Sequence, residues 1–295
     1  MSATRQELVL SQVGRLRRQV RRERRWANST LYAGVTIMAI VIGAALFAPL
    51  VAPHSPTAQD LAAAFQPPSW EHLMGTDNLG RDIFSRVVYA ARVDLQIGFL
   101  TTYVPLIYGV ILGAVAGYFG GWIDAVIMRL VDVVIAFPFL VLVIAILAIV
   151  GPGVNGVYIA VFAVAWSMYA RLTRAEMLVL REQQFIAAAE ALAFSRRRII
   201  FCHAIPNLIQ PNIVFSMADF VLNVLLVASL SFLGLGVRPP TPEWGAMVAE
   251  GQNFLLNAWW MTALPGAVIV TVGIALSLIG DGLAERLGER FRLTV

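Results

Sequence analysis

The sequence predicts an all-α membrane protein with six transmembrane helices. The chain has 295 residues, of which 59% are apolar and only 14% are charged, and its mean hydropathy is +0.75. Soluble domains are about 45–50% apolar and about 25% charged. The apolar residues also form long blocks, and all 22 basic residues are arginines gathered between those blocks. Together these observations favour a polytopic helical bundle over a soluble domain.

Each of the six blocks is long enough to cross a bilayer as a helix, which takes about 20 residues. Prolines at 105, 138 and 211 are candidates for kinks, because proline removes a backbone hydrogen bond inside a helix. The predicted spans are Leu31–Ala52, Leu95–Phe119, Leu130–Val150, Val157–Leu178, Leu208–Leu233 and Trp259–Ile279.

The arginines predict the orientation of these spans. They concentrate in residues 1–30, in the polar interruption 171–206 between the fourth and fifth spans, and in the tail. Basic residues favour the cytoplasmic side, so both termini and the interruption are expected in the cytoplasm and the segment 53–92 outside. A basic N-terminal segment, lipid-bound or solvated, thus precedes a transmembrane domain over 31–295. On the external side lie only Arg81, Arg86, Arg92 and Arg238.

Composition excludes several kinds of chemistry. The chain has no lysine, which rules out a P-loop lysine and a Schiff base, and its one cysteine, Cys202, excludes a disulfide within the chain. His54, His72 and His203 are far apart in sequence, and neither H-E-x-x-H nor G-x-S-x-G occurs. No catalytic set, no metal site and no nucleic-acid partner is predicted.

Polar and small residues inside the spans indicate how the bundle is built. Gly109, Gly113 and Gly117 recur every four residues and predict close helix packing. Asp219 and Asn223 share a helix face, where they either line a translocation path, together with Ser229, or hydrogen-bond across the bundle.

Three further local predictions concern charged residues and loops. Asp132 is expected to pair with Arg129 near the cytoplasmic end. The run Thr76–Asp82 lacks the spacing of a calcium loop and instead predicts a turn before a helix, with Gly80 left-handed and Asp77 or Asp82 as the cap. The loop after the fifth span is expected to hold Trp244 at the membrane interface.

The interruption 171–206 is the most informative segment of the chain. Its Ala-rich centre favours a short helix. Such a helix on a membrane protein is suited to docking in a groove of a cytosolic partner. One of its faces carries Phe185, Ala188, Ala189 and Leu192.

Four ordered motifs resemble those of a known family. They are Leu73-Met-Gly-Thr-Asp-Asn-Leu-Gly-Arg-Asp82, the stretch Phe185–Asn207, Leu230-Ser-Phe-Leu-Gly-Leu-Gly236 and Gly280-Asp-Gly-Leu283. From about Leu31 onwards the chain is similar to the inner-membrane permease subunits of bacterial ABC importers for dipeptides and oligopeptides. Phe185–Asn207 resembles the EAA loop of that family, whose helix couples to the ATPase.

The resemblance implies a type I ABC importer (MetI-like) permease fold, with the coupling helix between spans four and five. It implies a non-catalytic subunit that works with a homologous permease, two cytoplasmic ATPases and an extracytoplasmic peptide-binding protein. ATP and magnesium then bind to the ATPases and no cofactor binds to this chain. The expected ATPase-coupling residues are Phe185, Ala188, Ala189, Glu190, Leu192, Ser195, Arg197, His203 and Pro206.

The chain departs from the family pattern at three positions. Ala187 stands where the loop usually has glutamate, and Glu190, one turn on, is a candidate replacement. Ala193 stands where a glycine usually permits a left-handed helix end, and Val227 where relatives often carry an acid. The same permease signatures occur in importers of nickel and glutathione, and a channel or scaffold without an ATPase is the remaining alternative.

Overall fold

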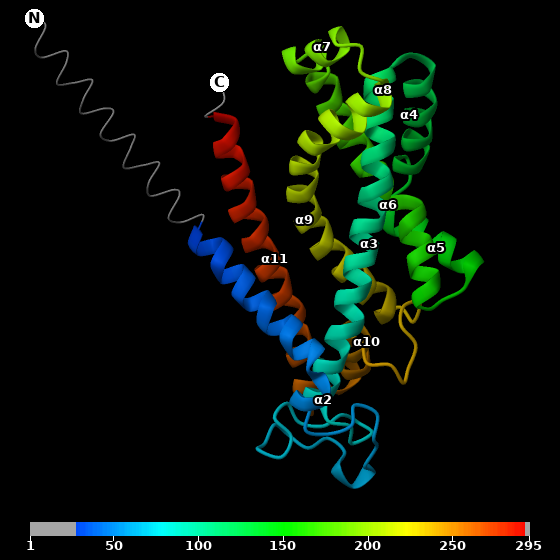
Figure 1. The fold of residues 1–295 in the computed structure, drawn as a ribbon. Helices are drawn as coiled ribbons and strands as arrows, with labels where there is room; N and C mark the ends of the chain where they lie inside the picture. Colours follow the sequence, from blue (N-terminus) through cyan, green and yellow to red (C-terminus); the bar gives the residue numbers. More distant parts are fainter. Residues whose placement is uncertain (1–27, 293–295) are drawn as a thin grey trace, which may run out of the picture.

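The computed structural model describes the backbone of residues 28–292 and the side chains of residues 28–286. The basic segment predicted over residues 1–30 therefore lies almost entirely outside the described residues. Across the described part the elements are helical, without a strand, and Figure 1 shows a bundle built around the long helix α3. The first described helix is Asn28–Leu46. The others are α2 Ala48–Val51, η1 Leu61–Ala63, α3 Ile83–Phe119, α4 Gly121–Ile135, α5 Phe139–Val150, α6 Val154–Leu180, α7 Gln184–Ala191, α8 Arg196–Arg198, η2 Ile199–Ala204, α9 Ile205–Phe232, α10 Trp244–Gly251, η3 Gln252–Phe254 and α11 Trp260–Arg292.

Five of the described helices are long and apolar enough to cross a membrane. The predicted third span is broken, because α4 and α5 meet at an angle of 89°. Pro138 is the N-cap residue of α5, and proline disfavours a helical residue before it, so the chain turns there. If α4 and α5 count as one span, the total is the six expected from sequence.

The predicted close packing of α3 is confirmed against α6. A Cβ atom at Gly113 would lie 2.4 Å from the Ala170 carbonyl oxygen, and one at Gly109 would lie 2.7 Å from that of Trp166. The two helices run side by side through the centre of Figure 1. Lipid supplies no hydrophobic force between helices, so this close backbone contact is what van der Waals packing requires.

The turn predicted before the second span is also confirmed. Asp82 is the N-cap of α3 and accepts a hydrogen bond from the Ser85 N–H at 2.7 Å. Gly80 has φ +71°, and a Cβ there would overlap the Asp60 carbonyl. The first turns of α3, to Arg92, belong to the expected polar segment 53–92 and are helical.

The two ends of the bundle differ, and each needs a name. The end that carries residues 53–82 and the 233–259 connection is called the loop end, and the end that carries α7 and α8 is called the α7 end (Figure 1). Trp244 was expected at the membrane interface, but it is fully buried at the loop end. Its indole N–H donates to the Val87 carbonyl at 3.1 Å, so the ring fastens α10 to α3.

Candidate functional site

Helix α7 is attached to the body of the protein by one side. Ile186 and Ala189 are 1% and 4% exposed, and they belong to an apolar cluster with Met177 of α6 and Leu208 of α9. This cluster also contains Ile199 and Ile200, next to α8. Helix α7 is therefore packed directly against two long helices.

The opposite side of α7 is an exposed apolar face. Phe185 and Leu192 are 42% and 69% exposed, and Ala188 between them is also exposed. These three residues are at positions i, i+3 and i+7 and lie on one side of the helix. Ala189 differs from the sequence-based expectation, because it packs inward and supports the helix instead of joining this face. The exposed α7 face is defined as Phe185, Ala188 and Leu192.

Ala193 ends α7 in the left-handed conformation, with φ +57°. The alanine at this position suggested a turn of altered geometry, but the turn keeps the conformation that the usual glycine permits. The Phe194 N–H donates to the Ala189 carbonyl at 3.1 Å and the Ala193 N–H to the Glu190 carbonyl at 2.9 Å. These two bonds define a Schellman motif, which normally carries glycine at the left-handed position. An alanine there adds steric strain, because its Cβ approaches the next carbonyl.

Side chains around this turn hold the exposed α7 face in place. Glu190 accepts a hydrogen bond from the Tyr118 hydroxyl of α3 at 2.9 Å. The guanidinium of Arg198 lies 4.2 Å from the centre of the Phe194 ring, which also contacts the His203 ring. These contacts tie α7 to α3 and to the start of α9.

The remaining predicted coupling residues are distributed over the following turns. Ser195 is the N-cap of α8 and accepts from the Arg198 N–H, while His203 Nδ1 lies 3.2 Å from the Arg198 carbonyl oxygen. Pro206 is in the first turn of α9, where its missing N–H costs nothing. Arg197 is exposed. The expected residues thus form one continuous segment at the α7 end.

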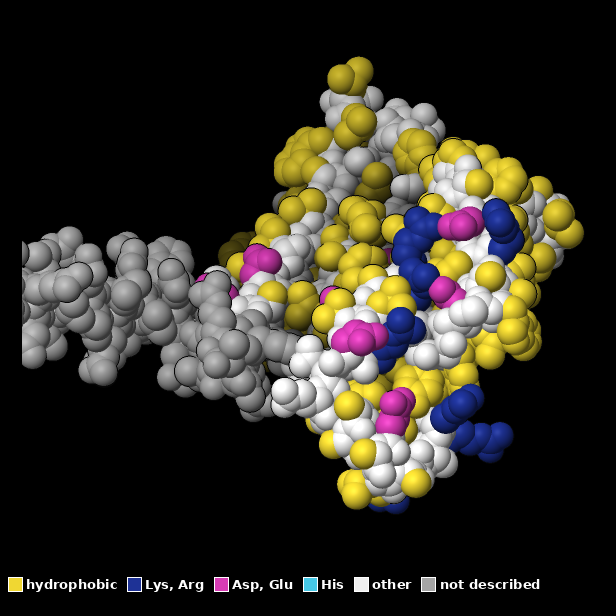
Figure 2. Space-filling view, turned by 90° about the horizontal axis from the view of Figure 1, so that it is seen from above, with side chains coloured by type: hydrophobic (Ala, Val, Ile, Leu, Met, Phe, Trp, Pro, Cys, Tyr) yellow, Lys and Arg dark blue, Asp and Glu magenta, His cyan; other side chains and the backbone are white. Residues whose placement is uncertain are grey.

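Ion pairs surround this segment. Arg174 of α6 donates two hydrogen bonds of 2.6 Å to Asp124 of α4. Asp132 was expected to pair with Arg129, but it pairs with Arg171 of α6 at 2.5 Å. Asp132 turns toward the neighbouring helix, which sequence spacing alone does not reveal. Figure 2, which looks onto this end, shows basic and acidic side chains interspersed among apolar ones.

The polar residues of α9 form bonds across the bundle. The Tyr169 hydroxyl donates to Asp219 at 2.7 Å, and the Asn223 amide donates to Asp219 at 3.1 Å and to the Thr102 hydroxyl at 3.0 Å. Asn223 is 2% exposed. This is the second of the two roles that the sequence left open for these side chains. Tyr169 and Thr102 were not predicted, because their place opposite Asp219 depends on how three helices pack.

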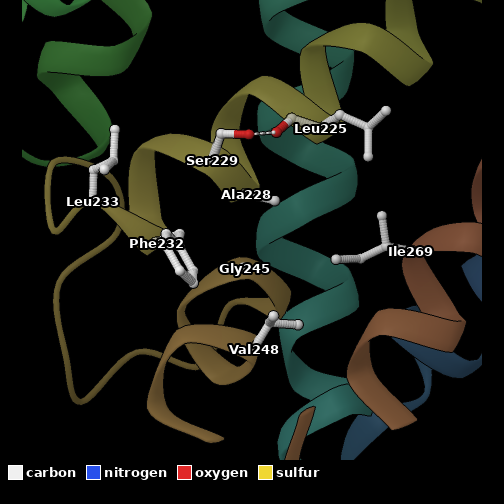
Figure 3. A pocket seen from close by; sticks show the side chains of 8 residues that line it. All are labelled: Leu225, Ala228, Ser229, Phe232, Leu233, Gly245, Val248 and Ile269. Atoms are coloured by element: carbon white, nitrogen blue, oxygen red, sulfur yellow. Dashed lines mark hydrogen bonds between the residues drawn. The ribbon is translucent and has the colours of Figure 1, made fainter. Parts of the chain in front are cut away.

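Ser229 lies elsewhere, in an apolar groove between α9, α10 and α11. Its hydroxyl donates to the Leu225 carbonyl of its own helix at 2.8 Å, and Figure 3 shows Ser229 next to Leu225, with Ile269 of α11 on the other side of the groove. The groove has a volume of about 360 Å³ and no charged side chain lines it. Asp219 and Asn223, the other predicted path residues, are not among the residues that line this groove.

The fold and this exposed segment define a polytopic membrane transport subunit. A family model described as "Binding-protein-dependent transport system inner membrane component" matches residues 109–293, and one for the N-terminal transmembrane domain of oligopeptide transport permease C matches residues 19–68. The chain belongs to this family of inner-membrane permease components of ABC importers.

Named relatives support this assignment over most of the chain. A dipeptide transport system permease protein of Alkalihalophilus pseudofirmus is 42% identical over 90% of this chain and 87% of its own length. A di/tripeptide transport system permease protein of Pseudomonas aeruginosa is 39% identical over 90% of this chain and 89% of its own length. A probable D,D-dipeptide permease protein of Escherichia coli is 38% identical over 86% of this chain and 85% of its own length.

Proposed function

We propose that this chain is the permease subunit of an ATP-driven importer that carries short peptides across the bacterial cytoplasmic membrane. It forms the translocation unit with a homologous second permease. Two cytoplasmic ATPases supply the energy and an extracytoplasmic binding protein delivers the peptide. The observation that carries the proposal is the exposed α7 face, an apolar surface on a helix that is buried on its other side, in a chain of this family.

The exposed α7 face is proposed to insert into a cleft of the ATPase. Phe185 supplies an aromatic anchor, a residue type that dominates binding energy when it is buried at an interface. The inward side of α7 then transmits ATPase movement to α6 and α9 through the apolar cluster around Ile186. ATP and magnesium are proposed to bind in the ATPases and not in this chain.

Glu190 has a different role under this proposal from the one expected by sequence. Its carboxylate accepts from Tyr118, so it fastens α7 to α3 instead of replacing the usual acidic contact at Ala187. If so, Glu190→Ala and Tyr118→Phe impair coupling to the same degree. If only Glu190→Ala impairs it, the carboxylate contacts the ATPase.

The orientation follows from the distribution of arginine. The α7 end, with both termini, is proposed to face the cytoplasm and the loop end the exterior, where the binding protein docks. Peptides are proposed as the substrate because the relatives are named for dipeptide and di/tripeptide transport. Nickel and glutathione are the substrates to include as competitors in the transport assay.

The test uses the assembled transporter in liposomes with ATP inside and the binding protein outside. Phe185→Ala removes the aromatic anchor. It is expected to lower dipeptide uptake, and the amount of ATPase that copurifies with the permease, by about tenfold or more. The matched control is Phe201→Ala, because Phe201 is 50% exposed at the same end but is not on α7. Equal retention of ATPase by both variants would contradict the coupling role and favour a channel or scaffold.

A further inference from the structure

Two of the three histidines in the chain come together with an aspartate at the loop end. His54 follows α2, His72 lies in the loop before α3, and Asp82 caps α3, so three separate segments meet. One possible ligand atom from each residue lies within 4.8 Å of the others. The sequence analysis predicted no metal site, because 18 positions separate the two histidines and no helical register links them.

The distances fit a small cation bound by these three side chains. Asp82 Oδ1 lies 3.0 Å from His72 Nδ1 and 3.8 Å from His54 Nδ1. In a tetrahedral zinc site with bonds of about 2.0–2.1 Å, neighbouring ligand atoms are about 3.4 Å apart. The two observed separations bracket that value, and the ligand atoms of the two histidines also lie within 4.8 Å of each other.

Hydrogen bonds fix the backbone around each of the three residues. The His54 N–H donates to Ser85 Oγ at 3.2 Å, and the His72 N–H donates to Ser69 Oγ at 3.1 Å. Asp82 uses its other oxygen, Oδ2, to cap α3, which leaves Oδ1 directed at the two imidazoles. Such second-shell support orients ligands before the metal arrives.

The donor atoms and the burial decide which cation is suitable. Imidazole nitrogen with one carboxylate oxygen suits zinc and related divalent transition metals, whereas magnesium and calcium prefer oxygen ligands only. The Asp82 side chain is 1% exposed and that of His72 is 11% exposed, but that of His54 is 40% exposed. A fourth ligand, water, can therefore enter from the side of His54.

We propose that His54, His72 and Asp82 bind a divalent transition-metal cation of the zinc type. The ion joins the end of the first helix, the loop and the start of α3 into one unit. A hydrogen bond joins His72 Nδ1 to Asp82 Oδ1 at 3.0 Å. When the cation binds between these two atoms, the neutral imidazole coordinates it through Nδ1 and carries its one proton on Nε2. The site is independent of which solute the protein transports.

The test measures zinc binding to the full chain in detergent after treatment with a chelator. Calorimetry is expected to show that each chain binds one Zn²⁺ and that Mg²⁺ and Ca²⁺ bind much more weakly. The melting temperature is expected to rise when Zn²⁺ is added. His54→Ala and Asp82→Asn are each expected to weaken Zn²⁺ binding by about 10–100-fold or more. Loss of an outer-shell partner alone has an effect of that size, and each of these variants loses a direct ligand. Asparagine caps a helix as well as aspartate does, so Asp82→Asn preserves the start of α3.

His203→Ala is the matched control, since it removes the third histidine, which lies at the α7 end. This variant is expected to bind Zn²⁺ with unchanged affinity. The proposal is overturned if the unsubstituted chain shows no saturable 1:1 binding, or if His54→Ala binds as tightly as the His203→Ala control.

Discussion

The loop end and the α7 end hold their charged residues in opposite ways. At the loop end the Arg81 and Arg86 side chains are 6% and 2% exposed and contact Asp77 and Glu250. Nearer the α7 end, the side chains of the Arg174–Asp124 pair are 32% and 17% exposed and those of the Arg171–Asp132 pair are 50% and 56% exposed. Buried ion pairs fix one arrangement, whereas exposed pairs are weak and exchange easily. The charges at the loop end therefore favour a rigid structure, whereas those nearer the α7 end stay accessible to solvent.

The loop-end network joins parts of the chain that are far apart in sequence. Arg81 and Arg86 both donate to Glu250 Oε2, at 2.8 and 2.9 Å, and so link the start of α3 to α10. Asp77 accepts from the Arg81 side chain at 2.6 Å and from two backbone N–H groups. Asp94 of α3 adds a contact by accepting from the Trp244 N–H at 3.1 Å. Arg81 and Arg86, which the sequence analysis expected on the external side, thus have buried acidic partners.

The largest predicted effect follows from removing Asp77. Asp77→Ala leaves two buried guanidinium groups sharing Glu250, and breaking a buried ion pair costs about 3–5 kcal/mol. The melting temperature of the purified protein is expected to fall strongly. Asp77→Asn loses the charge and the acceptor for the Arg81 side chain but keeps one oxygen for the two backbone N–H groups, so its melting temperature is expected to fall less. Comparable stability of Asp77→Ala and the unsubstituted chain would mean that the loop end is not held by its charges.

The next prediction concerns Gly113, in the half of α3 nearer α7, where we expect helix packing and not ion pairs to stabilise the bundle. Gly113→Ala places a methyl group 2.4 Å from the Ala170 carbonyl oxygen, so α3 and α6 must move apart. Overpacking of this kind costs about 1–3 kcal/mol. The same substitution at Gly43, which has no atom within 4 Å of the added Cβ, is the control. Thermal unfolding that does not distinguish the two variants would contradict the packing argument.

The features that the sequence predicted correctly are local ones. The glycine spacing of α3, the break at Pro138 and the cap at Asp82 each depend on a few neighbouring residues and on backbone geometry. Such features are encoded within one turn or one helix and survive any arrangement of the bundle.

The features that the sequence missed depend on which helices are neighbours. Asp132 had a candidate partner on its own helix and found another on α6. Helical periodicity placed Ala189 with Phe185 on one apolar face, but it cannot tell a face that meets the protein's own body from one that meets a partner. Trp244 was misjudged for the same reason, since its contact with the Val87 carbonyl comes from a distant segment.

A smaller, stabilising effect is expected at the end of α7. Ala193→Gly relieves the strain at φ +57° while keeping both bonds of the Schellman motif, a gain of about 1 kcal/mol. Hydrogen exchange of the 184–194 amides is expected to slow. Ala191→Gly, inside the helix, is the control and is expected to lose about 1 kcal/mol. Faster exchange in Ala193→Gly would show that the turn does not limit the stability of α7.

The smallest effect is expected at Asp132, and it completes the comparison with Asp77. An exposed pair contributes about 0–1 kcal/mol, because water solvates both partners and salt screens them. Asp132→Ala is therefore expected to shift the melting temperature little, and a double-mutant cycle with Arg171→Ala gives the pair energy directly. A coupling as large as that lost in Asp77→Ala would mean that this pair also fixes the structure, and the proposed contrast between a rigid loop end and an accessible α7 end would no longer hold.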